Sequence, residues 1–355
     1  MKKGWEEIFF FNFIKLNRGF DLPNNKIEAG NYPVIASTSI KAYHKNFKVI
    51  APCVTTGRSG SLGVVQYVNQ DSWPLNTTLY VKDFKKNDPK FVYYFLQTMD
   101  FDTFNSGAGV PTLNQNHLHH IKIQIPKDIN HQKRIASILS AYDDLIEVNN
   151  KRIELLEQSA RELYKEWFVR MRFPNYQNTK FNKGIPEGWK EELLGNILEL
   201  AYGKALKEEN RIWGKYPIYG SSGVVGFHIE PLVKSPSIII GRKGNVGSVF
   251  FSFQECYPID TVFYVVSSYS KLYLYQLLKR QTFIEGDAAI PGLSRNQAYK
   301  IKILFPNKKI IDIYDTNIRP IFTQIETLQK QNQELTAIRD RLLPRLISGK
   351  LEVKA

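Results

Sequence analysis

Two arginines in glycine-rich turns have the residue type and spacing expected for contacts with nucleic acid. The sequence GRSGSLG at 57–63 contains Arg58, and GRKGNVG at 241–247 contains Arg242 and Lys243. We expect a tight hairpin that lifts each arginine out of the fold, where its guanidinium group can bind a phosphate or pair with guanine. The glycine spacing differs from that of dinucleotide-binding loops, and a strand-like run follows instead of a helix. A surface β-turn with a solvated arginine is the alternative.

Two further segments carry polar side chains that change between corresponding positions. The sequence TLNQNH at 112–117 corresponds to GLSRNQ at 292–297. Asn and Gln can bind adenine through two hydrogen bonds, and Arg can bind guanine in the same way. We therefore predict that both segments line a groove of DNA. The predicted contact residues are Asn114, Gln115 and Asn116 in the first segment and Arg295 and Asn296 in the second.

The loop expected after Tyr32-Pro33, and its counterpart after Tyr216-Pro217, also differ in their hydrogen-bonding groups. A common scaffold with divergent polar side chains is what two readers of different DNA sequences need. Ordinary divergence of loops is the alternative. The candidates are Lys41, Tyr43, His44 and Lys45 in the first loop and Ser221, Ser222 and His228 in the second.

No group of residues makes a convincing catalytic or metal site. His117, His119 and His120 lie close together, but their counterparts are Gln, Tyr and Lys, and no cysteine or carboxylate completes a ligand set. The sequence DPK at 88–90 has the Asp-x-Lys of nuclease sites without a second carboxylate, and FPNY at 173–176 matches the amino-methyltransferase site only superficially. We predict no catalytic residue and no metal in this chain.

These candidates occur in pairs because the sequence contains an internal duplication. Tyr-Pro, Gly-Arg-x-Gly and aromatic-Pro-x-x-Thr patterns beginning at 32, 57 and 73 return at 216, 241 and 257, each 184 residues later. This period is too long for a solenoid repeat, whose units span about 20 to 50 residues. Short β-rich runs, a helix and a final strand follow in the same order in both copies. The sequence therefore predicts a duplicated domain of mixed α/β structure with a pseudo-two-fold axis.

Each copy is followed by a long segment with heptad-spaced apolar residues. The first segment contains no Pro or Gly from His131 to Arg170, so we expect two helices that pack as an antiparallel coiled coil. Polar residues Asn149, Asn332 and Arg339 interrupt the seam, where they would fix register or face solvent. Forty helical residues span about 60 Å, which makes the pair a spacer between the copies. The predicted seam residues are Leu139, Ile146, Ile153, Leu156, Leu163 and Trp167, with Ile325, Leu328, Leu335, Leu342 and Leu346.

Composition gives a coarse description of the partners. The formal net charge is +14, and the basic excess falls mainly in the two globular copies, with five charges in residues 1–130 and six in 171–307. Two separate basic surfaces suit polyanion binding, although a lysine-rich proteome would give the same charge. The two cysteines, Cys53 and Cys256, form no disulfide framework, and no stretch is apolar enough for a membrane span. We expect a cytoplasmic protein.

Three motifs resemble the specificity subunit of type I restriction-modification systems. They are LYKEWFV at 163–169 with RFP at 172–174, PEGW at 186–189, and the string from Leu335 to Leu351, which is the most specific. The resemblance extends over both copies. It implies two target recognition domains, each reading one half of a bipartite asymmetric DNA target, separated by two antiparallel helices. The sequence NKKII at 307–311 lacks the Glu-Gln pair that opens the family's helix.

The resemblance also implies partners. Two methyltransferase subunits would dock on this chain and motor-nuclease subunits would join them for cleavage, so that S-adenosylmethionine, ATP and Mg belong to those subunits and none to this chain. The rival hypotheses are a coiled-coil protein-protein scaffold with incidental basic surfaces and a stand-alone DNA-modifying enzyme. The predicted divisions are 1–130 for the first recognition domain, 131–172 for the first helix, 173–307 for the linker and second domain, and 308–355 for the second helix and tail.

Overall fold

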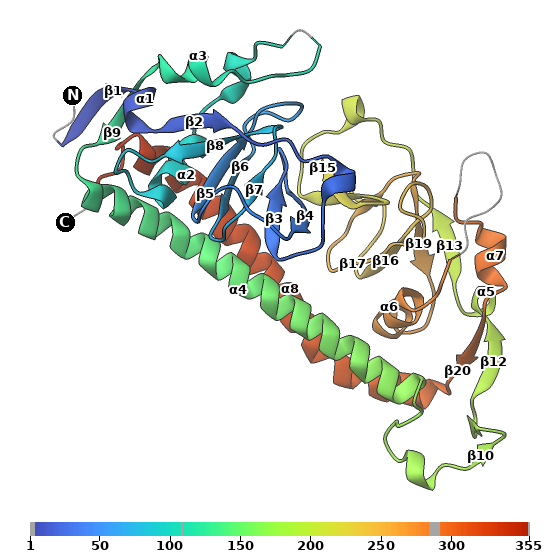
Figure 1. Ribbon diagram of the computed structural model, residues 1–355. Coiled ribbons are helices and arrows are strands. Elements are labelled where there is room, and N and C mark those ends of the chain that lie inside the picture. The colour runs from blue at the N-terminus through green and yellow to red at the C-terminus, as the bar shows by residue number, and fades with distance from the viewer. Residues whose placement is uncertain (1–3, 108, 284–291, 354–355) are drawn as a thin grey trace. The chain divides into compact units, whose positions relative to one another are not determined.

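The computed structural model describes residues 4–107, 109–283 and 292–353, and the chain divides into two compact units (Figure 1). Unit 1 comprises Met1–Val148 and Gln331–Ala355, and unit 2 comprises Asn149–Lys330. Unit 1 takes its residues from two stretches of chain and unit 2 from one, and neither unit coincides with one of the four predicted segments. Those boundaries stay a prediction.

Unit 1 is built on a four-stranded antiparallel sheet in the order β2-β8-β5-β6. A second sheet, β4-β3-β7, pairs β3 with β4 antiparallel and with β7 parallel, and β1 pairs with β9. Helix α2 packs on β5 and β6 through an apolar face. The bounds are β1 Trp5–Phe9, α1 Phe10–Phe13, β2 Lys15–Arg18, η1 Asn24–Lys26, β3 Tyr32–Ile35, β4 Ile40–His44, β5 Cys53–Gly57, β6 Val65–Val68, β7 Trp73–Pro74, β8 Thr78–Asp83, α2 Pro89–Gln97, η2 Phe101–Phe104, α3 Gln115–His119 and β9 Lys122–Pro126.

Unit 2 repeats this architecture. Its sheets are β13-β19-β16-β17, β15-β14-β18 and β12-β20, and a short β10-β11 hairpin is added. The bounds are η3 Tyr176–Asn178, β10 Phe181–Asn182, β11 Ile185–Pro186, β12 Lys190–Leu193, α5 Leu194–Ile197, β13 Glu199–Tyr202, η4 Glu208–Asn210, β14 Tyr216–Gly220, β15 Gly223–His228, β16 Ser237–Gly241, β17 Val249–Ser252, β18 Tyr257–Pro258, β19 Val262–Val266, α6 Lys271–Lys279, α7 Arg295–Tyr299 and β20 Lys302–Phe305. The predicted duplicated α/β scaffold is thus present in the fold.

Two helices of 40 residues, α4 (Ile129–Phe168) and α8 (Lys308–Ile347), complete the units. Unit 1 takes the beginning of α4 and the end of α8, and unit 2 takes the end of α4 and the beginning of α8. Opposite helix ends therefore meet within each unit. All eleven predicted seam residues are buried or half-buried. The Glu-Gln pair that opens the family's helix is missing before α8. Asn307 caps this helix, because its Oδ1 accepts the Ile310 N–H at 3.0 Å.

Aromatic and aliphatic side chains join each helix pair to its sheet. In unit 2, Tyr314 of α8 contacts Tyr164, Trp167 and Phe168 of α4 and Tyr273 of α6, with ring centroids 4.9 to 6.4 Å apart. In unit 1, Leu139 of α4 and Leu346 of α8 are buried in the same cluster as the sheet residues. Within the described residues, no helix is both long and apolar enough to cross a membrane.

Candidate nucleic-acid interface

Three turns meet at one edge of unit 1. They are the β3–β4 turn at 36–39, the glycine turn at 57–63 and the segment 112–116 that leads into α3. The Ser37 hydroxyl donates to the Ser59 carbonyl at 3.2 Å, and the Leu113 N–H donates to the Arg58 carbonyl at 2.8 Å. Ser59 also forms a β-bridge with Thr112. We call these three segments the three-turn surface of unit 1.

The same surface recurs in unit 2, where it consists of residues 221–222, 241–248 and 292–296. The Ser248 hydroxyl donates to the Ser221 carbonyl at 2.7 Å, and the Leu293 N–H donates to the Arg242 carbonyl at 2.8 Å. Lys243 forms a β-bridge with Gly292. Two of the predicted site segments, distant in sequence, are therefore brought together in both units.

Glycine is required where each glycine turn closes on itself. A Cβ added to Gly57 would lie 2.0 Å from the Ser61 carbonyl oxygen, and one added to Gly241 would lie 2.1 Å from that of Asn245. Gly60 has a φ of 85° and Gly244 a φ of 78°, in the left-handed region that favours glycine. The glycines thus shape the turn itself.

The arginines of these turns fold back toward their own unit, which corrects the expectation that they are lifted out. Nη1 of Arg58 donates to the Asn76 carbonyl at 3.3 Å, and Nη1 of Arg242 donates to the Asp260 carbonyl at 2.8 Å. Both side chains are half-buried. A guanidinium group has five N–H donors, so one such bond orients it while leaving the group able to bind a phosphate or base.

Two arginines lie over the Tyr202 ring in unit 2. The guanidinium carbons of Arg242 and Arg295 each lie 5.1 Å from the centroid of the Tyr202 ring, within cation–π range. This ring is 51% exposed. In unit 1 the corresponding positions hold Arg18, which pairs with Asp21 at 2.9 Å, and Gln115. The two surfaces therefore share a scaffold and differ in charge and shape.

His44 and His228 are structural residues, in contrast to their prediction as DNA contacts. Their side chains are only 3% and 8% exposed, so neither can reach a base. Nδ1 of His44 accepts the Glu28 N–H at 3.0 Å, and Nδ1 of His228 accepts the Ile212 N–H at 3.2 Å. Each imidazole also stands edge-on to an aromatic ring, that of Trp73 or Tyr257.

The segment expected as a loop at 41–44 is strand β4, and it does not correspond to Ser221 and Ser222. The 184-residue offset relates those serines to Ser37 and Thr38 in the β3–β4 turn. Lys41 donates to Asn24 at 2.7 Å, and Lys45 forms an ion pair with Glu28 at 2.6 Å. Lys41, Tyr43 and Lys45 are exposed but lie outside the three turns.

Three residues of these surfaces, Ser37, Arg18 and Tyr202, were not predicted from the sequence. The constant offset was the signal that could have found them, because it relates Ser37 to Ser221 and Arg18 to Tyr202 without a gap. The places of Arg18 and Tyr202 depend on the pairing of β2 with β8 and of β13 with β19, and the contact of Ser37 depends on the approach of two turns, neither of which local sequence reveals.

Asn114 has a structural role beside its predicted one. Its Oδ1 caps α3 by accepting the Asn116 N–H at 3.0 Å, and Ser294 caps α7 in the same position. Asn116 and Asn296 are exposed, while Gln115 and Arg295 are half-buried at the first position of their helices.

His119 links α3 to the backbone of β2. Its Nε2 accepts the Leu16 N–H at 3.2 Å, and in unit 2 the Tyr299 hydroxyl accepts the corresponding Leu200 N–H at 2.9 Å. Burial lowers the pKa of His119, and positive charge on His120 and Lys15 lowers it further. Within the described part of the chain, no three His, Cys, Asp or Glu side chains are grouped to hold a metal ion.

A family model described as "Type I restriction modification DNA specificity domain" matches residues 2–158 and again 186–337. The chain belongs to this family. It is 28% identical over 301 residues to the type I restriction enzyme MjaIX specificity subunit of Methanocaldococcus jannaschii, covering 75% of this chain and 69% of that protein. It is 23% identical over 404 residues to the MjaVIII specificity subunit of the same organism, covering 99% and 93%.

The fold is similar to a known crystal structure. The S subunit of a type I restriction-modification system from M. genitalium superimposes with a TM-score of 0.59 at 21% identity, covering 99% of this chain and 97% of that one. Each of the two specificity-domain matches contains one complete three-turn surface, including its arginine.

Proposed function

We propose that this chain is the specificity subunit of a type I restriction-modification complex, and that each three-turn surface reads one half of a bipartite, asymmetric DNA target. The main support for this proposal is that both surfaces have the same backbone contacts but different side chains. The positions of Arg58, Arg18 and Gln115 in unit 1 are occupied by Arg242, Tyr202 and Arg295 in unit 2. The common scaffold gives each unit the same backbone framework, and the exchanged groups give each a different base preference.

Within this proposal the residues divide into two roles. Half-buried Arg58, Arg242 and Lys243, anchored in the glycine turns, contact phosphates or guanine. The helix-start residues Gln115 and Arg295, with their exposed neighbours Asn116 and Asn296, present groups to base edges. His44 and His228 are excluded because they are buried. Lys41, Tyr43 and Lys45 are left as peripheral contacts, because they lie outside the three turns.

The long helices supply the spacing between the half-sites. Each has 40 residues, or about 60 Å of helix. Target halves that are read from one side of B-DNA lie about one helical turn, roughly 34 to 36 Å, apart. A helical spacer of this length is sufficient for that separation, and its remaining surface would dock two methyltransferase subunits. This chain would be non-catalytic, with S-adenosylmethionine, ATP and Mg carried by its partners.

The test is to co-express the chain with a cognate methyltransferase subunit and to map methylated adenines in the host DNA. The expected result is one asymmetric motif of two short specified halves separated by an unspecified gap. A contiguous motif would contradict the two-reader arrangement. DNA affinity of the complex should fall steeply with salt because phosphate contacts release counterions. Salt-independent association would instead favour the protein-protein scaffold.

A further inference from the structure

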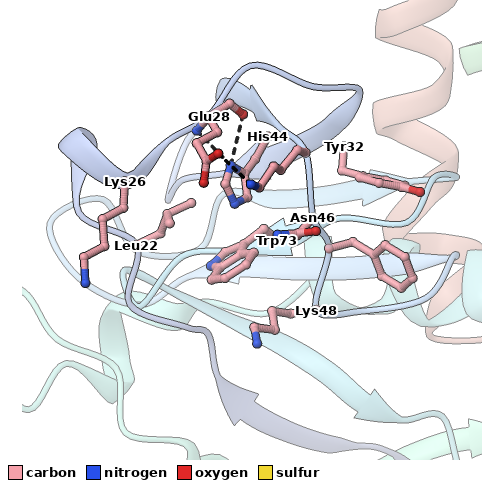
Figure 2. Close-up of a pocket in the computed structure, with 10 residues that line it drawn as sticks. Leu22, Lys26, Glu28, Tyr32, His44, Asn46, Lys48 and Trp73 are labelled. Carbon is pink, nitrogen blue, oxygen red and sulfur yellow. Dashed lines mark hydrogen bonds and ion pairs between the residues drawn. The ribbon is translucent and has the colours of Figure 1, made fainter.

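Unit 1 contains an open hollow of about 540 Å³ that belongs to neither the three-turn surface nor the helices. It lies beside the end of the β3–β4 hairpin at which Tyr32 pairs with His44 (Figure 2). The three-turn surface instead includes the turn at the other end of this hairpin. Its lining combines lysines with aromatic rings. The lining residues are Leu22, Lys26, Glu28, Tyr32, His44, Lys45, Asn46, Phe47, Lys48 and Trp73.

Positive charge dominates the hollow. Three lysines face one carboxylate, and the ion pair of Lys45 with Glu28 at 2.6 Å neutralises one of the three. Lys26 and Lys48 make up the remaining excess, and both side chains are exposed. The hollow therefore carries an excess of positive charge, which favours an anionic ligand.

Aromatic groups form the rest of the wall. Nζ of Lys48 lies over the Trp73 ring, 5.0 Å from its centroid, and the rings of Tyr32 and Phe47 contact each other with centroids 4.9 Å apart and planes inclined by 55°. Nε1 of Trp73 is buried and has no hydrogen-bond partner among the described residues. A buried donor of this kind is normally satisfied, so it marks a place for an acceptor. Flat rings beside cations suit a ligand that joins a planar base to a phosphate.

Unit 2 carries the same scaffold without this chemistry. Lys48 and its counterpart Leu232 donate equivalent backbone hydrogen bonds, to Ser72 at 3.0 Å and to Cys256 at 2.9 Å. The imidazoles of His44 and His228 have equivalent contacts. The lining nevertheless changes: Lys26, Lys45, Lys48 and Trp73 correspond to Asn210, Ile229, Leu232 and Tyr257. Since the fold forms without the lysines and the tryptophan, their presence in unit 1 calls for another explanation.

We propose that the hollow binds a single nucleotide, with its base against Trp73 and its phosphate held by Lys26 and Lys48. Regular duplex DNA cannot occupy it, because paired bases stack on one another and expose no face. The nucleotide comes either from an unpaired position in DNA or from a free nucleoside phosphate, and both present the same chemistry. Reading of the target by the three-turn surfaces does not depend on this site.

The first test measures binding to the full-length chain by isothermal titration calorimetry. AMP, adenosine and inorganic phosphate serve as probes. AMP should bind at least tenfold more tightly than either of the other two, because only AMP contacts both the ring and the lysines. Equal affinity for AMP and phosphate would overturn the proposal and leave a plain anion site.

Substitutions then test which residues bind AMP. K26N/K48L carries the residues of unit 2 at both positions, so it should fold, and it should lose AMP affinity by tenfold or more. W73Y, which also copies unit 2, should weaken AMP but leave the weak phosphate binding unchanged. The control K82V/K86A removes two exposed lysines outside the hollow and should bind AMP like the parent. Unchanged AMP affinity in K26N/K48L would overturn the proposal.

The source of the nucleotide is distinguished with two DNA duplexes that lack the target sequence, one fully paired and one with a single unpaired adenine. Tighter binding of the second duplex, abolished in K26N/K48L, would assign the site to DNA. Equal binding of the two duplexes, together with AMP binding that requires the lysines, would assign it to a free nucleotide. Failure of both AMP and the unpaired adenine to bind would refute the proposal.

Discussion

Nη1 of Arg339 lies 2.5 Å from Oδ1 of Asp143, and the Tyr94 hydroxyl donates to Oδ2 of the same carboxylate at 2.5 Å. Arg339, one of the two polar residues that interrupt the heptads of α8, is therefore paired with α4 and, through the carboxylate, with α2 of the sheet domain. Burial, together with the neighbouring carboxylate, raises the pKa of Tyr94 well above its usual value. The phenol thus stays protonated and continues to donate at ordinary pH.

Replacing Arg339 with Met should destabilise unit 1, because Asp143 would keep a half-buried charge with no cation opposite. Loss of one partner from a buried pair costs about 3–5 kcal/mol. The two side chains here are 23% and 27% exposed, so we expect about 1–2 kcal/mol after solvent screening. Chemical unfolding of the full chain measures this. The control is K122M, which removes the ion pair of Lys122 with Glu7, whose side chains are 60% and 43% exposed, and should cost under about 0.5 kcal/mol. Equal midpoints for the two variants would contradict the structural role of Arg339.

Stability of unit 1 should fall as pH decreases below about 6.5, the ordinary pKa of histidine. The folded state lowers the pKa of His119, so neutral His119 favours folding. This contribution is complete above the unfolded pKa and is lost as pH falls through the folded one. The hydrogen bond from Leu16 is worth about 0.5–1.5 kcal/mol.

H119Y, which copies Tyr299 of unit 2, should therefore reduce the loss of melting temperature between pH 7 and 5. Some pH dependence should persist, since burial also lowers the pKa of His131. H117Q changes an exposed histidine to the residue of unit 2 and should behave like the parent. An H119Y profile parallel to that of the parent would show that the Leu16 contact does not sense pH.

Arg295 should determine bases in one half of the target only. In R295A the loss of a bidentate pair with guanine would reduce discrimination by about 1–3 kcal/mol at one position, measured as relaxed methylation in that half. Q115A changes the corresponding residue of unit 1 and should relax the other half. Uniform weakening on all sequences by R295A would reassign Arg295 to a phosphate contact.

Deleting one heptad from each long helix should shorten the gap in the target. Seven residues account for about 10 Å of helix, equal to roughly three base pairs. Removal of 145–151 with 326–332 takes about two turns from each helix and so nearly preserves its buried face. Methylation mapping of the deletion variant measures the gap. Deletion from α4 alone is the control and should abolish the complex by breaking helix register. An unchanged gap in the double deletion would rule out the spacer role.

The sequence predicted the duplication, the two long helices and the turns that carry Arg58 and Arg242. Those features depend on local residue pattern and on comparison of the two copies. His44 was misassigned because burial is a property of packing: the polar imidazole is enclosed by Trp73 and the Glu28 backbone. The path of Arg58 back to Asn76 likewise depends on how distant turns approach each other.

Ser237 and Cys256 touch within the core of unit 2, with Oγ and Sγ 3.3 Å apart. In unit 1 the same two positions hold Cys53 and Ser72, with sulfur and oxygen interchanged. A chimera joined between these positions would bring Cys53 against Cys256, or Ser237 against Ser72, and give two thiols or two hydroxyls in place of one of each. Whole units can be exchanged without altering the pair. The interior of each unit thus sets where evolution or a protein engineer can join part of one unit to part of another.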